Sequence, residues 1–145
     1  MNYTASLRRA MIGGMPRSKA SPTPPVLHEL EAEIMEEVWR QGDTTVKLVM
    51  EALNKRAKPP RAYTTYMTVM RRLSDKGMLD RTRNGRQDTY SPRHSREEYQ
   101  ELRAEAEVHD LVDEFGDVAL AHFARSLSTL DPARRRQLQR LANGR

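Results

Sequence analysis

Five polar side chains recur at helical spacing in one short stretch of the chain and have the chemistry to contact a nucleic acid. They are Thr64, Thr65, Thr68, Arg71 and Arg72. The other side of the same predicted helix, over about residues 62–76, carries Tyr63, Tyr66, Val69, Met70 and Leu73. Guanidinium groups pair with phosphates or with guanine O6 and N7, and threonine donates to phosphate oxygens or lays its methyl group against thymine. The stretch therefore predicts one core face and one face suited to DNA.

A β-hairpin with arginines at its tip is predicted after this helix, which ends at Gly77. Alternating segments at 78–83 and 86–91 flank Asn84-Gly85, a dipeptide favoured in two-residue turns because both central residues take positive φ. The pairs that this turn predicts are Arg81 with Asp88 and Leu79 with Tyr90. Leu79 and Tyr90 would face the core, which leaves Arg83 and Arg86 at the tip.

Two amphipathic helices are predicted before these elements. The first ends near Gly42 and places on one side Leu27, Leu30, Ile34 and Val38, with Trp39 in or beside the core. The second, capped by Thr44 or Thr45 and followed by a turn at Lys58-Pro59-Pro60, buries Val46, Val49, Met50 and Leu53. Three helices followed by an arginine-tipped hairpin is the order of a winged helix-turn-helix. The fold class is therefore mainly α, with a β-hairpin wing.

Further helices are predicted after Ser95, where Glu98 completes a capping box. Gly116 interrupts them, and Asp131-Pro132 opens the last one. Their apolar stripes have no partner in the sequence and predict a homodimer interface of Leu102, Leu111, Val112, Phe115, Leu120, Phe123, Leu127, Leu138 and Leu141. We thus expect a disordered basic tail at 1–26, a DNA-binding domain at 27–94 and a helical dimerisation domain at 95–145.

Charge is concentrated along the chain in a way that supports a polyanionic partner. The 145 residues carry a net charge of +5, and the segment 61–93 alone carries +5, between segments 28–60 and 94–145 at −2 each. Residues 1–27 add +4. The candidate DNA contacts are Arg61, Thr64, Thr65, Thr68, Arg71, Arg72, Lys76, Arg81, Arg83 and Arg86.

Other classes of function find less support in the composition. The absence of cysteine excludes a disulfide scaffold, a thiolate metal site and a cysteine nucleophile. No apolar run approaches the ~20 residues of a membrane span, so we expect a soluble, cytoplasmic protein. The sequence contains no phosphate-binding loop or metalloprotease pattern, and the His109/Asp113 pair has metal-ligand spacing that more often marks surface groups. We therefore expect no enzyme activity, no metal and no cofactor.

Three segments resemble the penicillinase repressor (BlaI/MecI) family. They are AYTTYMTVMRRL at 62–73, followed by Lys76-Gly77, LEAEIMEEVW at 30–39 and TVKLVMEAL at 45–53. The resemblance extends from Leu27 to about Ala142. It implies a homodimeric transcriptional repressor whose winged helix binds palindromic double-stranded operator DNA and whose C-terminal helices form the dimer.

Two departures from that family concern the signal that releases the repressor. Copper-responsive relatives carry C-terminal cysteine pairs, and this chain has none, which excludes copper sensing through thiolates. Antibiotic-responsive relatives are cut at an Asn-Phe bond that aligns here with Ala106-Glu107. We therefore expect a different inducer or signalling partner. The alternative function, a winged helix used only for protein contacts, predicts an apolar or acidic exposed face on the 62–76 helix.

Overall fold

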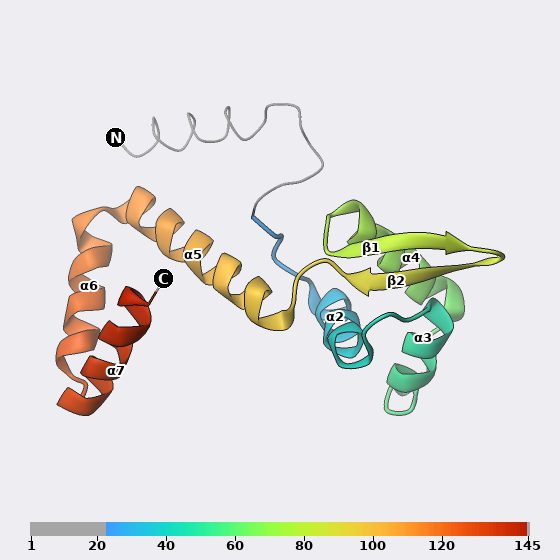
Figure 1. Cartoon of the computed structure of the whole chain (residues 1–145), viewed down its shortest axis with the longest axis horizontal. Coiled ribbons are helices and arrows are strands. Elements are labelled where there is room, and N and C mark those ends of the chain that lie inside the picture. Colours follow the sequence, from blue (N-terminus) through green and yellow to red (C-terminus); the bar gives the residue numbers. More distant parts are fainter. Residues whose placement is uncertain (1–22, 145) are drawn as a thin grey trace. The chain divides into compact units, whose positions relative to one another are not determined.

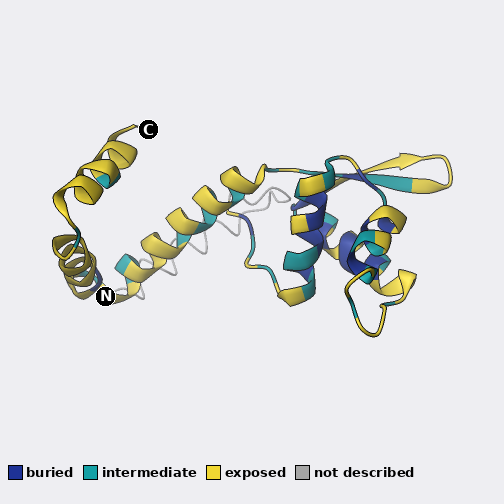
Figure 2. Cartoon of the chain, turned by 90° about the horizontal axis from the view of Figure 1, so that it is seen from below, coloured by how far each residue is buried: buried dark blue, intermediate teal, exposed yellow. Residues whose placement is uncertain are grey.

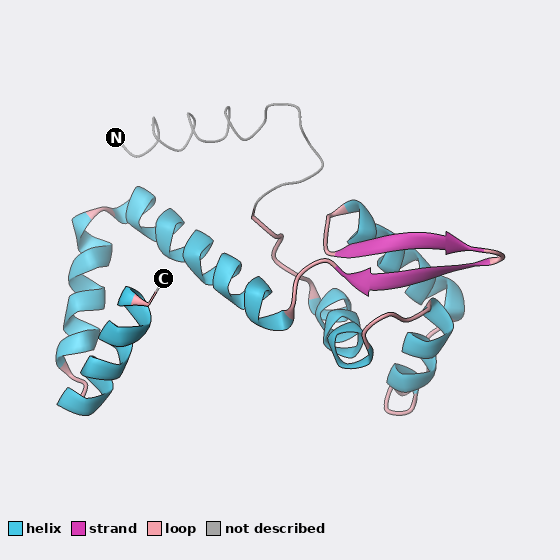
Figure 3. Ribbon diagram, viewed as in Figure 1, coloured by secondary structure: helices cyan, strands magenta, loops and turns pink. Residues whose placement is uncertain are grey.

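Three helices and an antiparallel hairpin form the first of two compact units (Figures 1 and 3). The computed structural model describes residues 23–144, which divide into units after Ala106. The elements of the first unit are α2 (Glu29–Gln41), α3 (Val46–Asn54), α4 (Tyr63–Asp75), β1 (Leu79–Asn84), β2 (Gln87–Pro92) and the beginning of α5 (Arg96–Phe115). This is the winged-helix order predicted from the sequence, and the hairpin β1–β2 is called the wing below.

The core of this unit is formed by the predicted apolar faces of α2, α3 and α4. Figure 2 colours the buried residues of these helices dark blue, and residues at the beginning and end of the wing complete the core. The core residues are Ile34, Met35, Val38, Val46, Val49, Leu53, Tyr66, Val69, Met70, Leu73, Met78, Leu79 and Tyr90. Tyr63, which the sequence predicts on this face, lies in the first turn of α4 and is 46% exposed.

Thr44 and Thr45, the two residues before α3, have different structural roles. Thr45 caps the helix, since its hydroxyl accepts a hydrogen bond from the Leu48 backbone N–H at 3.2 Å. Thr44 pairs instead with Tyr90, and each backbone N–H donates to the other residue's carbonyl at 2.8 Å. This bridge attaches β2 to the segment between α2 and α3, a contact that the sequence did not predict.

The register of the wing differs from the predicted one. The observed pairs include Arg83 with Asp88 and Arg81 with Tyr90, so the two-residue turn is Gly85-Arg86 and not Asn84-Gly85. Gly85 supplies the positive φ, +67°, at the first central position, while Asn84 stays in β1. A shift of two residues keeps each side chain on its own face. Leu79 and Tyr90 are therefore buried as predicted, although they are not directly opposite each other.

The beginning of α5 belongs to the first unit. The Ser95/Glu98 capping box is present. The Ser95 backbone N–H donates to the Glu98 carboxylate and the Glu98 backbone N–H donates to the Ser95 hydroxyl, each at 3.0 Å. Tyr99 packs on Trp39 with ring centroids 5.5 Å apart, and its hydroxyl donates to the Pro25 carbonyl at 3.0 Å. Pro24 is buried, so the last part of the expected tail packs on this unit, while 1–22 lie outside the described residues. The first unit therefore continues past the proposed boundary at 94/95.

The second unit contains the end of α5, α6 (Asp117–Ser128) and α7 (Pro132–Asn143). Gly116, with φ +58°, ends α5 as predicted, and the Asp131 carboxylate caps α7 by accepting from the Arg134 N–H at 2.9 Å. Among the described residues of this unit, only Ala119 is buried. Among the described residues, no helix combines the length and the apolarity that crossing a membrane requires.

Candidate nucleic-acid interface

The five polar residues of α4 lie together on an exposed surface of the first unit. We call this surface the α4 polar face: Thr64, Thr65, Thr68, Arg71 and Arg72. On the opposite side of α4, Tyr66, Met70 and Leu73 are completely buried, which fixes the rotation of the helix about its own axis. The side chains of the α4 polar face are short hydroxyls and long guanidiniums, so an incoming DNA groove can approach the helix backbone closely.

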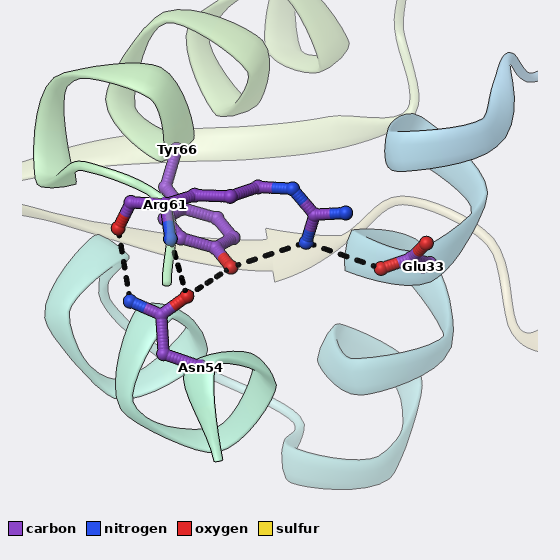
Figure 4. A network of polar contacts seen from close by, with 4 residues as sticks. All are labelled: Glu33, Asn54, Arg61 and Tyr66. Atoms are coloured by element: carbon purple, nitrogen blue, oxygen red, sulfur yellow. Dashed lines mark hydrogen bonds and ion pairs between the residues drawn. The ribbon is translucent and has the colours of Figure 1, made fainter. Parts of the chain in front are cut away.

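A polar cluster fixes the beginning of α4 against the end of α3 (Figure 4). The Asn54 side chain donates to the Arg61 carbonyl at 2.9 Å and accepts from the Arg61 N–H at 3.0 Å. The Tyr66 hydroxyl, within the core, donates to the same Asn54 oxygen at 2.8 Å. Asn54 thereby supplies hydrogen-bond partners to both backbone groups of Arg61 and to the buried Tyr66 hydroxyl. It holds the turn between the two helices in one conformation.

Two predicted DNA contacts, Arg61 and Lys76, are engaged within the fold. The Arg61 guanidinium lies 3.5 Å from the Tyr66 hydroxyl and 3.4 Å from the Glu33 carboxylate, and these two neighbours raise the pKa of Arg61. The Lys76 ammonium pairs at 2.8 Å with the buried Glu31. These two cations attach the two ends of α4 to α2. Contact of Arg61 and Lys76 with DNA stays a prediction.

Burial and hydrogen bonding act in opposite directions on Glu31. Burial raises the pKa of the Glu31 carboxyl, but hydrogen bonds from the His28 backbone at 3.0 Å and from Lys76 outweigh it and hold the pKa below its usual value. The carboxylate is therefore ionised at neutral pH. It joins the first turn of α2 to the last residues of α4.

The wing places three exposed arginines next to α4. Arg81 and Arg83 belong to β1, as the sequence predicted, and Arg86 belongs to the turn, whereas the sequence predicted it at the start of the second strand. Asp88 lies among them with only 12% of its side chain exposed, 3.7 Å from the Arg81 guanidinium and 3.9 Å from that of Arg83. This carboxylate is the acidic member of an otherwise basic surface.

A hollow of about 140 Å³ separates the wing from α4. Tyr63, Met67 and Arg71 line it from α4, at successive intervals of four residues. Its other walls come from Thr45, Val46, Arg83, Arg86, Gln87, Asp88 and Tyr90. Sequence reasoning missed Tyr63 and Met67 as surface residues of this site. The sequence carries no local signal for either residue, because the hollow is formed by segments that are distant along the chain.

The His109/Asp113 pair, which has metal-ligand spacing in the sequence, lies on α5. The His109 ring and the Asp113 carboxylate are 3.9 Å apart on α5. Among residues 23–144, no group of three or more ligand-type side chains comes together.

Comparison with known proteins assigns the chain to a family. A family model described as penicillinase repressor matches residues 27–143. The chain belongs to the penicillinase repressor family. This match covers the winged helix and the C-terminal helices alike, and it confirms the resemblance seen in the sequence.

Individual relatives cover a smaller part of the penicillinase repressor fold. The proteins named transcriptional regulator BlaI from two strains of Mycobacterium tuberculosis are 41% identical over 73 residues, which is 50% of this chain and 51% of theirs. The chain thus spans about half the length of these curated relatives. A solution structure of the DNA-binding domain of the repressor BlaI is 27% identical, covers 52% of this chain and 89% of that domain, and has a TM-score of 0.45. These descriptions are of transcription regulators, a non-enzymatic class.

Proposed function

We propose that this chain is a transcriptional repressor that binds double-stranded operator DNA. The observation that carries the proposal is the α4 polar face, which presents two arginines and three threonines to solvent beside an arginine-rich wing. In winged-helix proteins the corresponding helix enters the major groove. Arg71 and Arg72 are placed to read guanine edges or bind phosphate, and Thr64 and Thr68 to contact phosphate or thymine methyl groups.

The wing supplies contacts to the DNA backbone in this proposal. Arg86 lies in the turn and Arg83 lies close to it in β1. The DNA backbone beside the groove passes this region when α4 occupies the groove. Such contacts add affinity that is independent of sequence and that falls with salt. The alternative, a winged helix used only for protein contacts, calls for an apolar or acidic α4 surface. The α4 polar face has neither character.

We further propose that the protein acts as a homodimer on a two-fold symmetric operator. Large apolar side chains of the second unit are exposed in the single chain: Val108 47%, Leu111 40%, Phe115 51%, Leu120 49%, Phe123 36%, Leu127 43% and Leu141 65%. Leu120, Phe123 and Leu127 share one side of α6 at intervals of three and four residues. In this proposal a second copy covers this side, and the two α4 helices bind half-sites about one DNA turn, about 34–36 Å, or a multiple of it apart.

Release of the repressor follows from the same arrangement. Tethering two winged helices raises the effective concentration of the second, which adds ~10²–10⁴ in affinity. A ligand or partner that separates the helices of the second unit would therefore empty the operator. The surface on which such a signal acts in this proposal includes Leu111, Val112, Phe115, Leu120 and Phe123.

The experiment is selection of bound duplexes from a random DNA library by the full chain, followed by titration of an enriched duplex and of a scrambled duplex of the same composition. We expect an inverted repeat, two chains per duplex and a specificity ratio of at least ~10³. Absence of enrichment, or equal affinity for both duplexes, would refute sequence-specific binding. One chain per duplex would refute the dimer.

A further inference from the structure

One carboxylate lies inside the basic surface that we assign to DNA. Asp88 is opposite Arg83 in the wing register and diagonal to Arg81, so all three side chains share one face of the hairpin. It also lines the hollow next to α4, together with Arg71, Arg83 and Arg86. The Asp88 side chain is only 12% exposed, whereas those of Arg81 and Arg83 are 42% and 75% exposed. The arginines are therefore free to turn toward DNA, and the carboxylate is not free to turn away.

The ion pairs of Asp88 are too weak to hold the arginines permanently. At 3.7 Å and 3.9 Å, with partners open to water, each pair contributes little to folding. A phosphate can therefore displace Asp88 from Arg83. The negative charge of Asp88 then stays behind the guanidinium, close to the incoming phosphate, and opposes it.

The net effect of Asp88 on affinity differs between operator DNA and other DNA. Non-specific binding rests almost entirely on attraction to phosphates, so a fixed negative charge in the wing lowers it directly. Operator binding also uses base contacts from the α4 polar face and needs the wing arginines in one geometry. Weak ion pairs that bias the arginines toward that geometry before binding reduce the ordering cost of operator binding and offset part of the repulsion by Asp88 there.

We propose that Asp88 is a specificity-determining residue, which restrains Arg81 and Arg83 and lowers the affinity of the wing for phosphate outside the operator. The inference rests on the proposed DNA-binding function and deepens it. The wing then contributes to discrimination between operator and other DNA, although it contacts no base.

The test compares Asp88→Asn with wild type on an enriched operator duplex and on a scrambled duplex, over a series of salt concentrations. We expect the affinity of Asp88→Asn for scrambled DNA to rise by about 3- to 10-fold, with a salt dependence steeper by up to about one unit. Affinity for the operator should rise less, so the specificity ratio falls. Asp88→Glu, which keeps the charge, should restore most of the wild-type ratio.

Asp80→Asn is the matched control. Asp80 lies in the same hairpin, on the other face of β1, and its carboxylate binds Arg93 at 2.7 Å. Removing this charge should change the specificity ratio less than Asp88→Asn does. Equal effects of the two variants would mean that net charge alone is responsible and would overturn the assignment to Asp88.

Two further outcomes separate the inference from the function on which it rests. If Asp88→Asn weakens binding to both duplexes, the carboxylate is a structural support of the wing, and the inference is wrong while DNA binding stands. The same holds if the ratio does not change. If wild type itself does not distinguish the two duplexes, the proposed function fails first.

Discussion

The Tyr66 hydroxyl donates a 2.8 Å hydrogen bond to the side-chain oxygen of Asn54, across the turn that joins α3 to α4. Tyr66 is fully buried, so its ring fixes the position of this hydroxyl within the core. Asn54 transmits that position to the loop by binding both backbone groups of Arg61. The orientation of the α4 polar face thus depends on one amide side chain outside that face.

Replacing Asn54 by leucine should destabilise the first unit by about 1–3 kcal/mol, because the Arg61 backbone groups and the Tyr66 hydroxyl lose their partner. Tyr66→Phe, which removes only one of the three hydrogen bonds, should cost less, about 1 kcal/mol. Urea unfolding followed by circular dichroism measures both values. A Tyr66→Phe effect larger than that of Asn54→Leu would contradict the role given to Asn54.

The ion pair between Glu31 and Lys76 should make stability depend on pH. Because hydrogen bonds hold the folded-state pKa of Glu31 below its ordinary value of 4.5, its stabilising contribution is complete above pH 4.5 and is lost as the pH falls through the folded-state pKa. Wild type should therefore be more stable than Glu31→Gln at neutral pH, and the difference should shrink in acid. Unfolding titrations between about pH 3 and pH 7 measure it. The control is Glu29→Gln, an exposed position in the same turn of α2, and a difference that stays constant with pH would argue against the Glu31 assignment.

Sequence patterns predicted the elements of both units well because each element carries its own local signal. The Ser95/Glu98 box, the Asp131 cap and the glycine at 116 act over a few residues and appear where expected. The buried side of α4 follows from helical periodicity alone, since Tyr66 and Met70 must both face the core.

Contacts between distant segments account for what the sequence did not predict. The bridge from Thr44 to Tyr90 joins residues far apart in the chain, and nothing near either residue indicates it. The predicted register of the wing was wrong because an Asn-Gly dipeptide is compatible with two positions of the two-residue turn. Pairing along both strands decides between them. The roles of Arg61 and Lys76 depend on carboxylates of α2 that approach only after folding.

The apolar side of α6 should control self-association. Phe123→Asp places a charge at the centre of the stripe formed with Leu120 and Leu127, and it should convert a dimer into a monomer at micromolar concentration. Val118→Asp makes the same change on the opposite side of α6, at a residue that is 61% exposed, and should leave the dimer intact. Sedimentation equilibrium distinguishes the two variants. A wild-type protein that is monomeric at this concentration would remove the basis of the dimer proposal.

The tip of the wing should contribute affinity without sequence preference. Arg83→Ala and Arg86→Ala should each weaken binding to both duplexes and reduce the salt slope by about one unit. Arg86→Ala should do so by similar factors on operator and scrambled DNA, whereas Arg83→Ala also removes a partner of Asp88 and should change the ratio. Fluorescence anisotropy at several salt concentrations measures both quantities. If the two variants keep wild-type affinity and salt dependence, the wing does not contact the phosphate backbone.

The most direct test of base reading by the α4 polar face is a comparison of Arg71→Ala and Arg72→Ala with Arg96→Ala. Arg96 pairs with Glu36 outside α4 and the wing and serves as the control for loss of one positive charge. Each protein is titrated with the enriched operator and with a set of duplexes that carry every single-base change in one half-site. At least one of Arg71→Ala and Arg72→Ala should lose about 1–3 kcal/mol on the operator and become indifferent to the base at one position, while Arg96→Ala keeps the full base preference. Unchanged base preference in both α4 variants would contradict the claim that this helix reads the operator.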